Sequence, residues 1–414
     1  MKEKAHYLLL IIFTFLFIYY PPIFPTNTLH ILGVISWIII LCNMSSFSKL
    51  FIRGGYIKEI LFSLFMTSYL CIVLLMNGGT DLLIGYVFIT LGIEILPISF
   101  VIVYFLKKLN GKRKFTDLII HVGFLQSVFS VLTFLIPQLQ LWVINTMLSY
   151  GYRDIIIRLS QHRMFGLSYT FPYSMPIVQG VIACLSMYLG INKNAKYFIF
   201  TPFLIFSGII NARICIVIAL IGALLILFDS LRLKFRKKYK IVIIVLFFTL
   251  LFNPISNFIQ EVSPSTYAWL YDGGEELINL FYGDTSGSYM SYITNKANYI
   301  LPSDLNFVFG TSKRVIRDNT TYKSDIGYVN DIWLGGIVYA VIIYSYLIIK
   351  LKKIWQSLNN QNANGTITSL FLLLVIASGN LKGTIYAVNE FINLFYLIYI
   401  ACILGIVRQK AQQK

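Results

Sequence analysis

Residues 196–229 read KYFIFTPFLIFSGIINARICIVIALIGALLILFD, an apolar stretch of 34 residues with Asn211-Ala212-Arg213 near its middle. A helix needs about 20 apolar residues to cross the roughly 30 Å hydrocarbon core of a bilayer, so this stretch is too long for one span. It has the length of two short spans joined by a tight turn at Asn211–Arg213. The stretch therefore predicts a helical hairpin inside a membrane.

The rest of the chain repeats this apolar character. Of its 414 residues, 57% are hydrophobic and only 12% are charged, whereas about a quarter of a typical globular chain is charged. This excludes a cytosolic enzyme, a disordered protein and a disulfide scaffold, and predicts an all-α, polytopic membrane protein. Twelve transmembrane helices are expected at 6–24, 28–44, 57–76, 82–106, 115–136, 171–190, 196–211, 212–229, 240–259, 328–350, 366–381 and 384–407.

The basic residues set the predicted orientation. Net charge is +17, but the lysines and arginines lie in short clusters between apolar stretches, as topology determinants do, and not in a nucleic-acid-binding pattern. With both termini in the cytoplasm, 24 of the 34 basic residues face inward. Merging the two spans of 196–229 would send the cluster at 232–240 outward. The positive-inside rule thus supports the hairpin.

This topology leaves two sizeable outer segments, 137–170 and 260–327. The chain is accordingly divided into helices over 1–259, a large, partly helical periplasmic loop over 260–327, and helices over 328–414. Within the loop, Asp272-Gly273-Gly274-Glu275 is similar to a helix-capping box and predicts a helix start there. Long loops of this composition usually carry function, so chemistry is expected on the outer face.

Three polar residues stand out because they fall inside predicted spans. Arg213 lies at the outer tip of the hairpin, either snorkelling to the interface or fixed to bind phosphate through its planar guanidinium. Glu94 lies near the middle of a span and must be paired, protonated or facing water. Glu390 lies close in sequence to Asn380, Lys382 and Asn389, which predicts a polar pocket near the outer leaflet.

Arginines also enter helices from the outer side at two further places. Gln161-His162-Arg163-Met164-Phe165-Gly166 precedes the sixth span, and Arg314, Arg317 and Asp325 precede the tenth. Charged runs in loops are usually exposed to solvent. The alternative is that the arginines of these two segments and Arg213 line one common cavity. The sequence contains no nucleotide-binding loop, paired metal carboxylates or His-x-x-x-His helix, so neither a cofactor nor a metal is expected.

These segments resemble the Wzy-type O-antigen polymerases, a family related to the O-antigen ligases. The similarity lies in Arg163-Met164-Phe165-Gly166 ahead of a span, in Asn211-Ala212-Arg213, and in Phe309-Gly310, 324–328 and Gly335-Gly336-Ile337. The chain departs from the family at Ile214, where a small hydroxyl residue is common. Its large loop also contains no histidine, which favours polymerase over ligase.

The resemblance implies a protein of the bacterial inner membrane that catalyses glycosyl transfer between repeat units of a surface polysaccharide. The donor would be an undecaprenyl-diphosphate-linked oligosaccharide. Arg163, Arg213 and Arg317 are expected to hold diphosphates, with Arg314 and Glu390 as further substrate-binding residues. Arg213 would stabilise the departing diphosphate. The base that takes the proton of the attacking sugar hydroxyl would be His162, Asp325 or Asp331, with Asp325 favoured. The expected partners are the lipid-linked oligosaccharide, the bilayer and a chain-length regulator protein, with no nucleic acid.

The alternative hypothesis is that the protein is a transporter that flips the same lipid-linked sugars across the membrane. Twelve spans suit a transporter, and Glu94 would serve as a midplane proton or ion site. The long outer loop, the lack of repeat symmetry and the outward placement of the arginines argue against it. Ligase activity is the other alternative.

Overall fold

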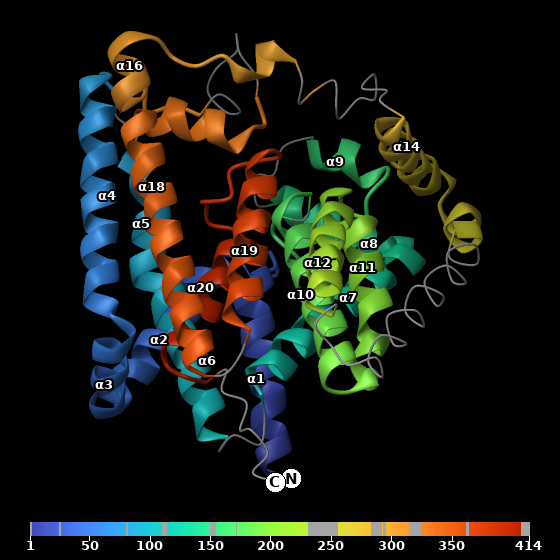
Figure 1. The fold of residues 1–414 in the computed structure, drawn as a ribbon, viewed down its shortest axis with the longest axis horizontal. Helices are drawn as coiled ribbons and strands as arrows, with labels where there is room; N and C mark the ends of the chain where they lie inside the picture. The colour runs from blue at the N-terminus through green and yellow to red at the C-terminus, as the bar shows by residue number, and fades with distance from the viewer. Residues whose placement is uncertain are drawn as a thin grey trace. The chain divides into compact units, whose positions relative to one another are not determined.

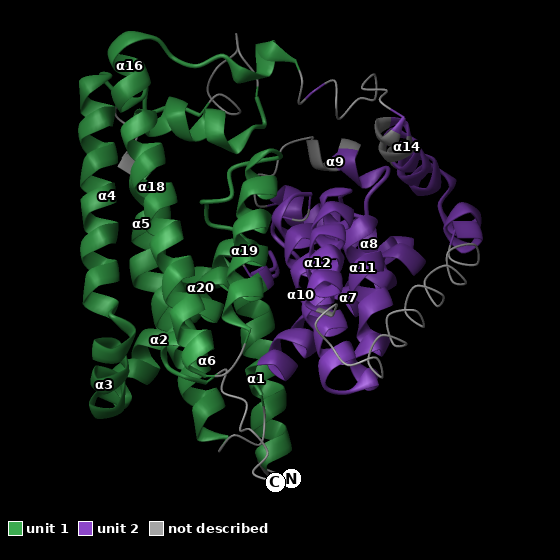
Figure 2. Ribbon diagram, viewed as in Figure 1, with its two compact units in different colours: residues 1–18, 26–115, 293–414 green, residues 19–25, 116–292 purple. Residues whose placement is uncertain are grey.

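The computed structural model of the chain describes residues 2–24, 26–79, 82–109, 114–149, 155–170, 172–230, 256–282, 292, 295–314, 324–361 and 364–406. Within these ranges every regular element is a helix (Figure 1). The helices form two compact units, one of residues 1–18, 26–115 and 293–414 and the other of residues 19–25 and 116–292 (Figure 2). The units cut across the linear division expected from the sequence, since the segment 260–327 contributes to both.

The first unit is built around α20, whose residues are buried along almost its whole length. Helix α20 packs against α6 and α18, and α18 also packs against α19. The helices of this unit are α1 (Lys2–Tyr19), α2 (Thr28–Cys42), α3 (Met44–Gly54), α4 (Tyr56–Met76), η1 (Leu82–Gly85), α5 (Tyr86–Thr90), η2 (Leu91–Ile95), α6 (Leu96–Lys108), η4 (Lys296–Tyr299), α16 (Asp304–Phe309), α18 (Gly327–Asn360), α19 (Gly365–Asn380) and α20 (Glu390–Ile403).

The span expected at 82–106 contains an irregular turn near its middle. Residues 91–95 form a π-helical turn just before Pro97. Proline has no N–H, so the carbonyl of Ile93, four residues earlier, loses its helical donor. That carbonyl accepts a hydrogen bond from the indole Nε1 of Trp37 at 2.8 Å, and the neighbouring Gly92 carbonyl accepts one from the Tyr56 hydroxyl at 3.0 Å. Side chains of neighbouring helices thus satisfy the backbone at this break.

The same turn carries Glu94, which the sequence required to be paired, protonated or facing water. It is paired: Oε1 lies 2.6 Å from Nδ1 of His30 on α2. The Tyr86 hydroxyl lies 3.4 Å from the other nitrogen of the same imidazole. Among the described residues, the second carboxylate oxygen of Glu94 is buried without a hydrogen-bond partner.

A second ion pair lies in the core of this unit. Lys350 of α18 donates a hydrogen bond to Glu59 of α4, and both side chains are almost fully buried. The Tyr346 hydroxyl also donates to Glu59, and the lysine ammonium lies 4.2 Å from the ring centroid of Tyr399. Lys350 is the last residue of the span expected at 328–350, but α18 continues ten residues further, to Asn360, and carries Lys350 within the helix.

The segment around α16 contacts α18 backbone to backbone. Gly336 interrupts α18 with φ 74° and ψ −178°. The interruption frees the carbonyls of Trp333 and Leu334, which accept hydrogen bonds from the N–H groups of Thr311 and Ser312 at 2.7 and 3.0 Å. A Cβ on Gly336 would overlap the carbonyl of Val308. Two segments quoted for the family resemblance, at Gly310 and at Gly335-Gly336, are therefore in direct contact.

The second unit packs around α10, which is buried on nearly all sides against α11, α12 and η3. Close packing on α10 depends partly on Gly180, where a Cβ would lie 3.0 Å from the side chain of Ile218 on α12. The helices of this unit are α7 (Phe115–Leu135), α8 (Pro137–Ser149), α9 (Ile155–Ser160), α10 (Ser174–Asn192), η3 (Ala195–Ile199), α11 (Phe200–Ile209), α12 (Ile214–Ser230) and α14 (Pro264–Phe281).

The helix ends confirm the predicted break at Asn211–Arg213, since α11 ends at Ile209 and α12 begins at Ile214. Both are shorter apolar helices, so that each crosses a membrane stays a prediction. Five described helices are long and apolar enough to cross a membrane: 56–76, 86–108, 115–135, 174–192 and 327–360. Helices α2 and α3, bent by 111°, would make a sixth if counted as one span. The number of twelve stays a prediction, and residues 240–255 of the ninth expected span lie outside the described residues.

Two expected helix starts are wrong. Helix α14 begins at Pro264, not at Asp272, because proline at the first helical position needs no hydrogen-bond acceptor. Helix α20 begins at Glu390, although a span was expected from 384. Asn389 sets this start, since its side chain accepts a hydrogen bond from the N–H of Ile392 at 2.9 Å.

Replacing Gly336 with alanine should destabilise the protein. Its φ and ψ lie in a region that only glycine adopts readily, and strain of this kind costs about 1–3 kcal/mol. Thermal unfolding of the detergent-solubilised protein should therefore show a lower melting temperature. Gly274→Ala is the matched control, because a Cβ at this helical position meets nothing within 4 Å and alanine favours helix. Equal melting temperatures for the two variants would show that the backbone at Gly336 accepts alanine without strain, against this prediction.

Candidate functional site

The segment Arg163–Gly166 adopts a fixed, non-helical conformation in the second unit. Gly166 has φ 60°, and a Cβ there would lie 2.6 Å from both Gln126 Nε2 and Ser130 Oγ of α7. Only glycine fits because it lacks a Cβ and adopts positive φ without strain. Phe165 precedes it and is fully buried against α8 residues Val143 and Met147.

Polar side chains of α7 and α8 bind the backbone of this segment. Gln140 on α8 donates to the carbonyl of Arg163 at 3.1 Å and accepts from the N–H of Phe165 at 3.4 Å. Thr133 on α7 accepts from the N–H of Gly166 at 3.3 Å. These bonds replace the ones that a helix would make, so they hold the backbone that carries Arg163 in one conformation.

The tip of the α11–α12 hairpin lies beside the same segment. The N–H of Met164 donates to the carbonyl of Ile210 at 3.4 Å. Asn211 is fully buried, and its side-chain amide donates to the carbonyl of Ser207 at 2.9 Å. The two arginine-bearing motifs, 163–166 and 211–213, are therefore joined through their backbones.

Helix α14 completes the cluster with a tryptophan that both arginines contact. The guanidinium carbons of Arg163 and Arg213 lie 5.3 and 5.0 Å from the ring centroid of Trp269. Arg213 also donates to the carbonyl of Trp269 and pairs with Glu276, at 3.3 Å between Nη1 and Oε2. Trp269 and Glu276 are seven residues apart, two helical turns, and so lie on one face of α14. The cluster of Arg163, Arg213, Trp269 and Glu276 is called the arginine site below.

The arginine site has an excess of positive charge. Glu276 is the carboxylate partner of Arg213, whereas no carboxylate in the described part of the chain lies within ion-pair distance of Arg163. Burial, together with the nearby charge of Arg213, lowers the pKa of Arg163 to about 10. Arg163 is still protonated at neutral pH, so the site holds two cations against one anion. An additional anion would relieve this repulsion.

Unpaired polar atoms surround the arginine site. Within the described residues, Nε of Arg213, Nδ1 of His162 and Oδ1 of Asn211 are buried without hydrogen-bond partners. His162 directly precedes Arg163 in the chain. Buried polar groups are normally paired, and unpaired ones are often found at ligand-binding or catalytic positions. Two of these atoms belong to residues that the sequence proposed as catalytic.

Arg314, Asp325 and Glu390 belong to the other unit. Arg314 acts electrostatically on the buried carboxylate of Asp331, whose Oδ2 accepts a hydrogen bond from the Tyr344 hydroxyl at 2.7 Å. Asp325 is exposed just before α18. Glu390 is fully buried as the first residue of α20, where the helix dipole favours a negative charge.

The structure thus joins Arg163 and Arg213 and places His162 next to them. Asn380 and Asn389, expected to line a pocket with Glu390, bind backbone instead: Asn380 accepts from the N–H of Ile385 at 3.1 Å, and Asn389 donates to its carbonyl at 3.0 Å. Arg317 lies outside the described residues.

Sequence reasoning missed Glu276 as the partner of Arg213. The seven-residue spacing from Trp269 was a usable signal, but the assumed helix start at Asp272 left Trp269 outside the helix. In the described residues, no group of three side chains is arranged to bind a metal ion. Comparisons with protein-family models, curated proteins and solved structures give no significant match.

Removing the two arginines should affect stability in different directions. The pKa of Arg163 is lowered in the folded state, so its charge opposes folding at neutral pH. Arg163→Met should leave the melting temperature in detergent unchanged or raised by a few degrees. Arg213→Met should lower it, since a hydrogen bond and an ion pair are lost. If Arg163→Met destabilises as much as Arg213→Met, the charge excess is not a source of strain.

Proposed function

We propose that the protein polymerises a surface polysaccharide by joining oligosaccharide repeat units carried on undecaprenyl diphosphate, as O-antigen polymerases do. The observation that carries the proposal is the arginine site, in which Arg163 and Arg213 contact one tryptophan ring and Arg163 has no carboxylate partner among the described residues. Arginine suits a diphosphate because its planar fork makes bidentate bonds to phosphate oxygens. The apolar helices support a lipid-linked substrate.

In the proposed reaction, the hydroxyl oxygen of an acceptor sugar forms a bond to the anomeric carbon of the donor chain. The bond from that carbon to the diphosphate oxygen breaks, and its electron pair leaves with the diphosphate. The hydroxyl proton passes to a base. Because the donor is already activated, the reaction needs no nucleotide.

The two arginines would stabilise the charge that develops on the leaving diphosphate. Opposite charges 4 Å apart interact by about 4 kcal/mol at an effective dielectric of 20, which is the scale of electrostatic catalysis. Burial of the site supports this role, because the guanidinium of Arg163 is largely removed from water. The Trp269 ring offers an apolar face against which a sugar can pack.

Three bases are named from the sequence, and His162 and Asp325 are the two we propose. Asp331 is fully buried and its carboxylate accepts a hydrogen bond from the Tyr344 hydroxyl. His162 adjoins Arg163 in the chain and lies in the same compact unit as the arginine site. Asp325 is exposed and lies in the other unit. The neighbouring arginine favours His162, which reverses the preference stated from the sequence.

Pyrophosphate is a direct probe of the arginine site. The solubilised protein should bind pyrophosphate, and Arg163→Met should abolish the binding seen by titration calorimetry. Glu276 competes for Arg213, so Glu276→Gln should tighten binding of pyrophosphate at least fivefold.

Glu275→Gln is the matched control for this titration, because it removes the same charge from the adjacent, exposed position. Its affinity should equal that of the parent protein. Equal gains from both variants would mean that net charge, and not the ion pair with Arg213, governs binding.

In cells, Arg213→Ala should abolish long polysaccharide chains while single repeat units still reach the surface. Arg213→Lys should restore chains only partly, because lysine keeps the charge but loses the fork. Arg53→Ala, at an exposed position on α3, is the control and should keep normal chain lengths. Chain length is read from gels of the surface polysaccharide. Normal chains in a stably expressed Arg213→Ala strain would contradict the proposal.

One observation favours the alternative, a transporter of the same lipid-linked sugars. The Glu94–His30 pair lies on a π-helical turn within an apolar span, and titratable groups inside a membrane often mark proton or ion pathways. A transporter variant that fails, such as Glu94→Gln, would accumulate unflipped intermediates inside the cell. A failed polymerase instead displays one repeat unit outside. A ligase defect would leave long chains on the lipid carrier.

A further inference from the structure

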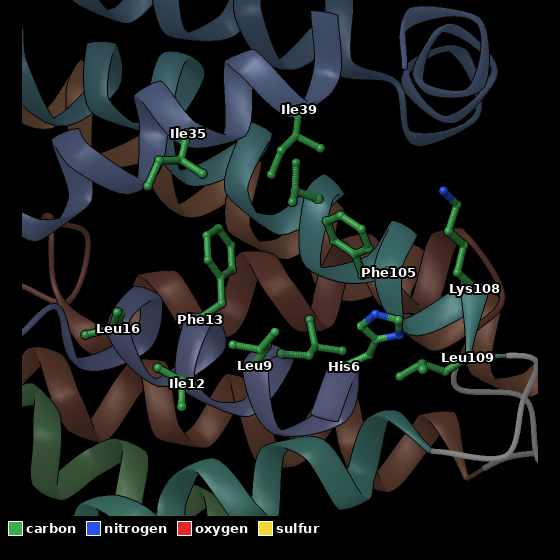
Figure 3. Close-up of a pocket in the computed structure, with 12 residues that line it drawn as sticks. His6, Leu9, Ile12, Phe13, Leu16, Ile35, Ile39, Phe105, Lys108 and Leu109 are labelled. Atoms are coloured by element: carbon green, nitrogen blue, oxygen red, sulfur yellow. The ribbon is translucent and has the colours of Figure 1, made fainter. Parts of the chain in front are cut away.

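A cavity of about 580 Å³ lies between α1, α2 and α6 of the first unit. Its walls are apolar along most of their length, formed by side chains such as Leu9, Phe13, Ile35, Ile39 and Phe105. Figure 3 shows these side chains pointing into a common space. The volume lies within the range of about 300–1,000 Å³ that is typical of ligand pockets.

Two of the twelve lining residues are polar and able to carry positive charge, His6 and Lys108. Both lie at the same end of the cavity, while Leu16 lies at the other (Figure 3). This follows from the helix directions, because His6 is near the start of α1 and Lys108 is the last residue of α6. The cavity thus has a long apolar part and one cationic end.

Lys108 has no carboxylate partner among the described residues. The Lys108 ammonium lies 4.5 Å from the ring centroid of Tyr104, and no described carboxylate lies within ion-pair distance of it. Several lining side chains are exposed, among them Leu9 and Ile35. Helix α6 belongs to the segment 86–108, which is long and apolar enough to cross a membrane. In a bilayer, lipid would therefore have access to the cavity.

We propose that this cavity binds one acyl chain of an anionic phospholipid, whose phosphate lies against Lys108 and His6. The apolar walls match the chain, and the cationic end matches the phosphate at the level where a membrane-spanning helix ends. A zwitterionic phospholipid fits the walls equally well but has a weaker electrostatic interaction with the lysine. The site does not depend on the proposed polymerase activity.

Native mass spectrometry of the full-length protein with phosphatidylglycerol or phosphatidylcholine tests the charge requirement. Phosphatidylglycerol should bind more tightly, and Lys108→Gln should weaken it about fivefold, the effect of one lysine near a membrane surface. Lys107→Gln is the matched control: it removes the same charge from the adjacent residue, which is exposed and does not line the cavity. Equal affinity for both lipids, or equal losses in both variants, would overturn the proposal.

A phosphatidylglycerol with a photoreactive group on its acyl chain tests the location without any substitution. After illumination, labelled peptides should come mainly from 9–16 of α1 and 35–39 of α2. Ile39→Trp should then narrow the cavity and reduce this labelling. Labels spread evenly over other membrane-facing helices, or unchanged by Ile39→Trp in a protein that melts normally, would show that no defined site exists.

Discussion

Backbone groups inside a membrane protein have no water to bind, so each break in a helix requires a protein partner for the freed N–H and C=O groups. This constraint explains the irregular segments of the chain. Gln140 and Thr133 bind the backbone of 163–166, Trp37 binds the carbonyl that Pro97 releases, and Asn380 and Asn389 bind the segment before α20. These non-helical segments, like the helices, therefore have hydrogen-bond partners for backbone groups that would otherwise be unpaired.

The arginine site is a consequence of this constraint. Because 163–166 and the hairpin tip are fixed by buried hydrogen bonds, two guanidinium groups are held near each other in spite of their like charges. Trp269 and Glu276 compensate only part of the repulsion. The anionic ligand that we propose would relieve the remaining repulsion. The surrounding helices thus hold Arg163 in a position where its own charge opposes folding.

Local features of the sequence were sufficient to predict several elements. Apolar length located α4, α7 and α10, and Asn211–Arg213 marked the hairpin tip between α11 and α12. Pairings between distant residues were not predictable in this way. Glu59 and Lys350 are 291 positions apart, and only the packing of α4 on α18 brings them together. The contact of Arg213 with Glu276 was missed for a local reason, the wrong helix start, since Pro264 and not the Asp272 motif begins α14.

The Glu59–Lys350 pair has a consequence for biogenesis. Ribosomes add roughly 5–20 residues per second, so Lys350 emerges about 15–60 s after Glu59. During that interval α4 carries an acidic side chain with no lysine to neutralise it, at a position that ends up buried. The whole of residues 116–292, the larger part of the second unit, is translated meanwhile. The first unit therefore completes its folding only after residues 116–292 have been translated. Until then its N-terminal segments, 1–18 and 26–115, remain in the translocation machinery or in the lipid without the C-terminal segment 293–414.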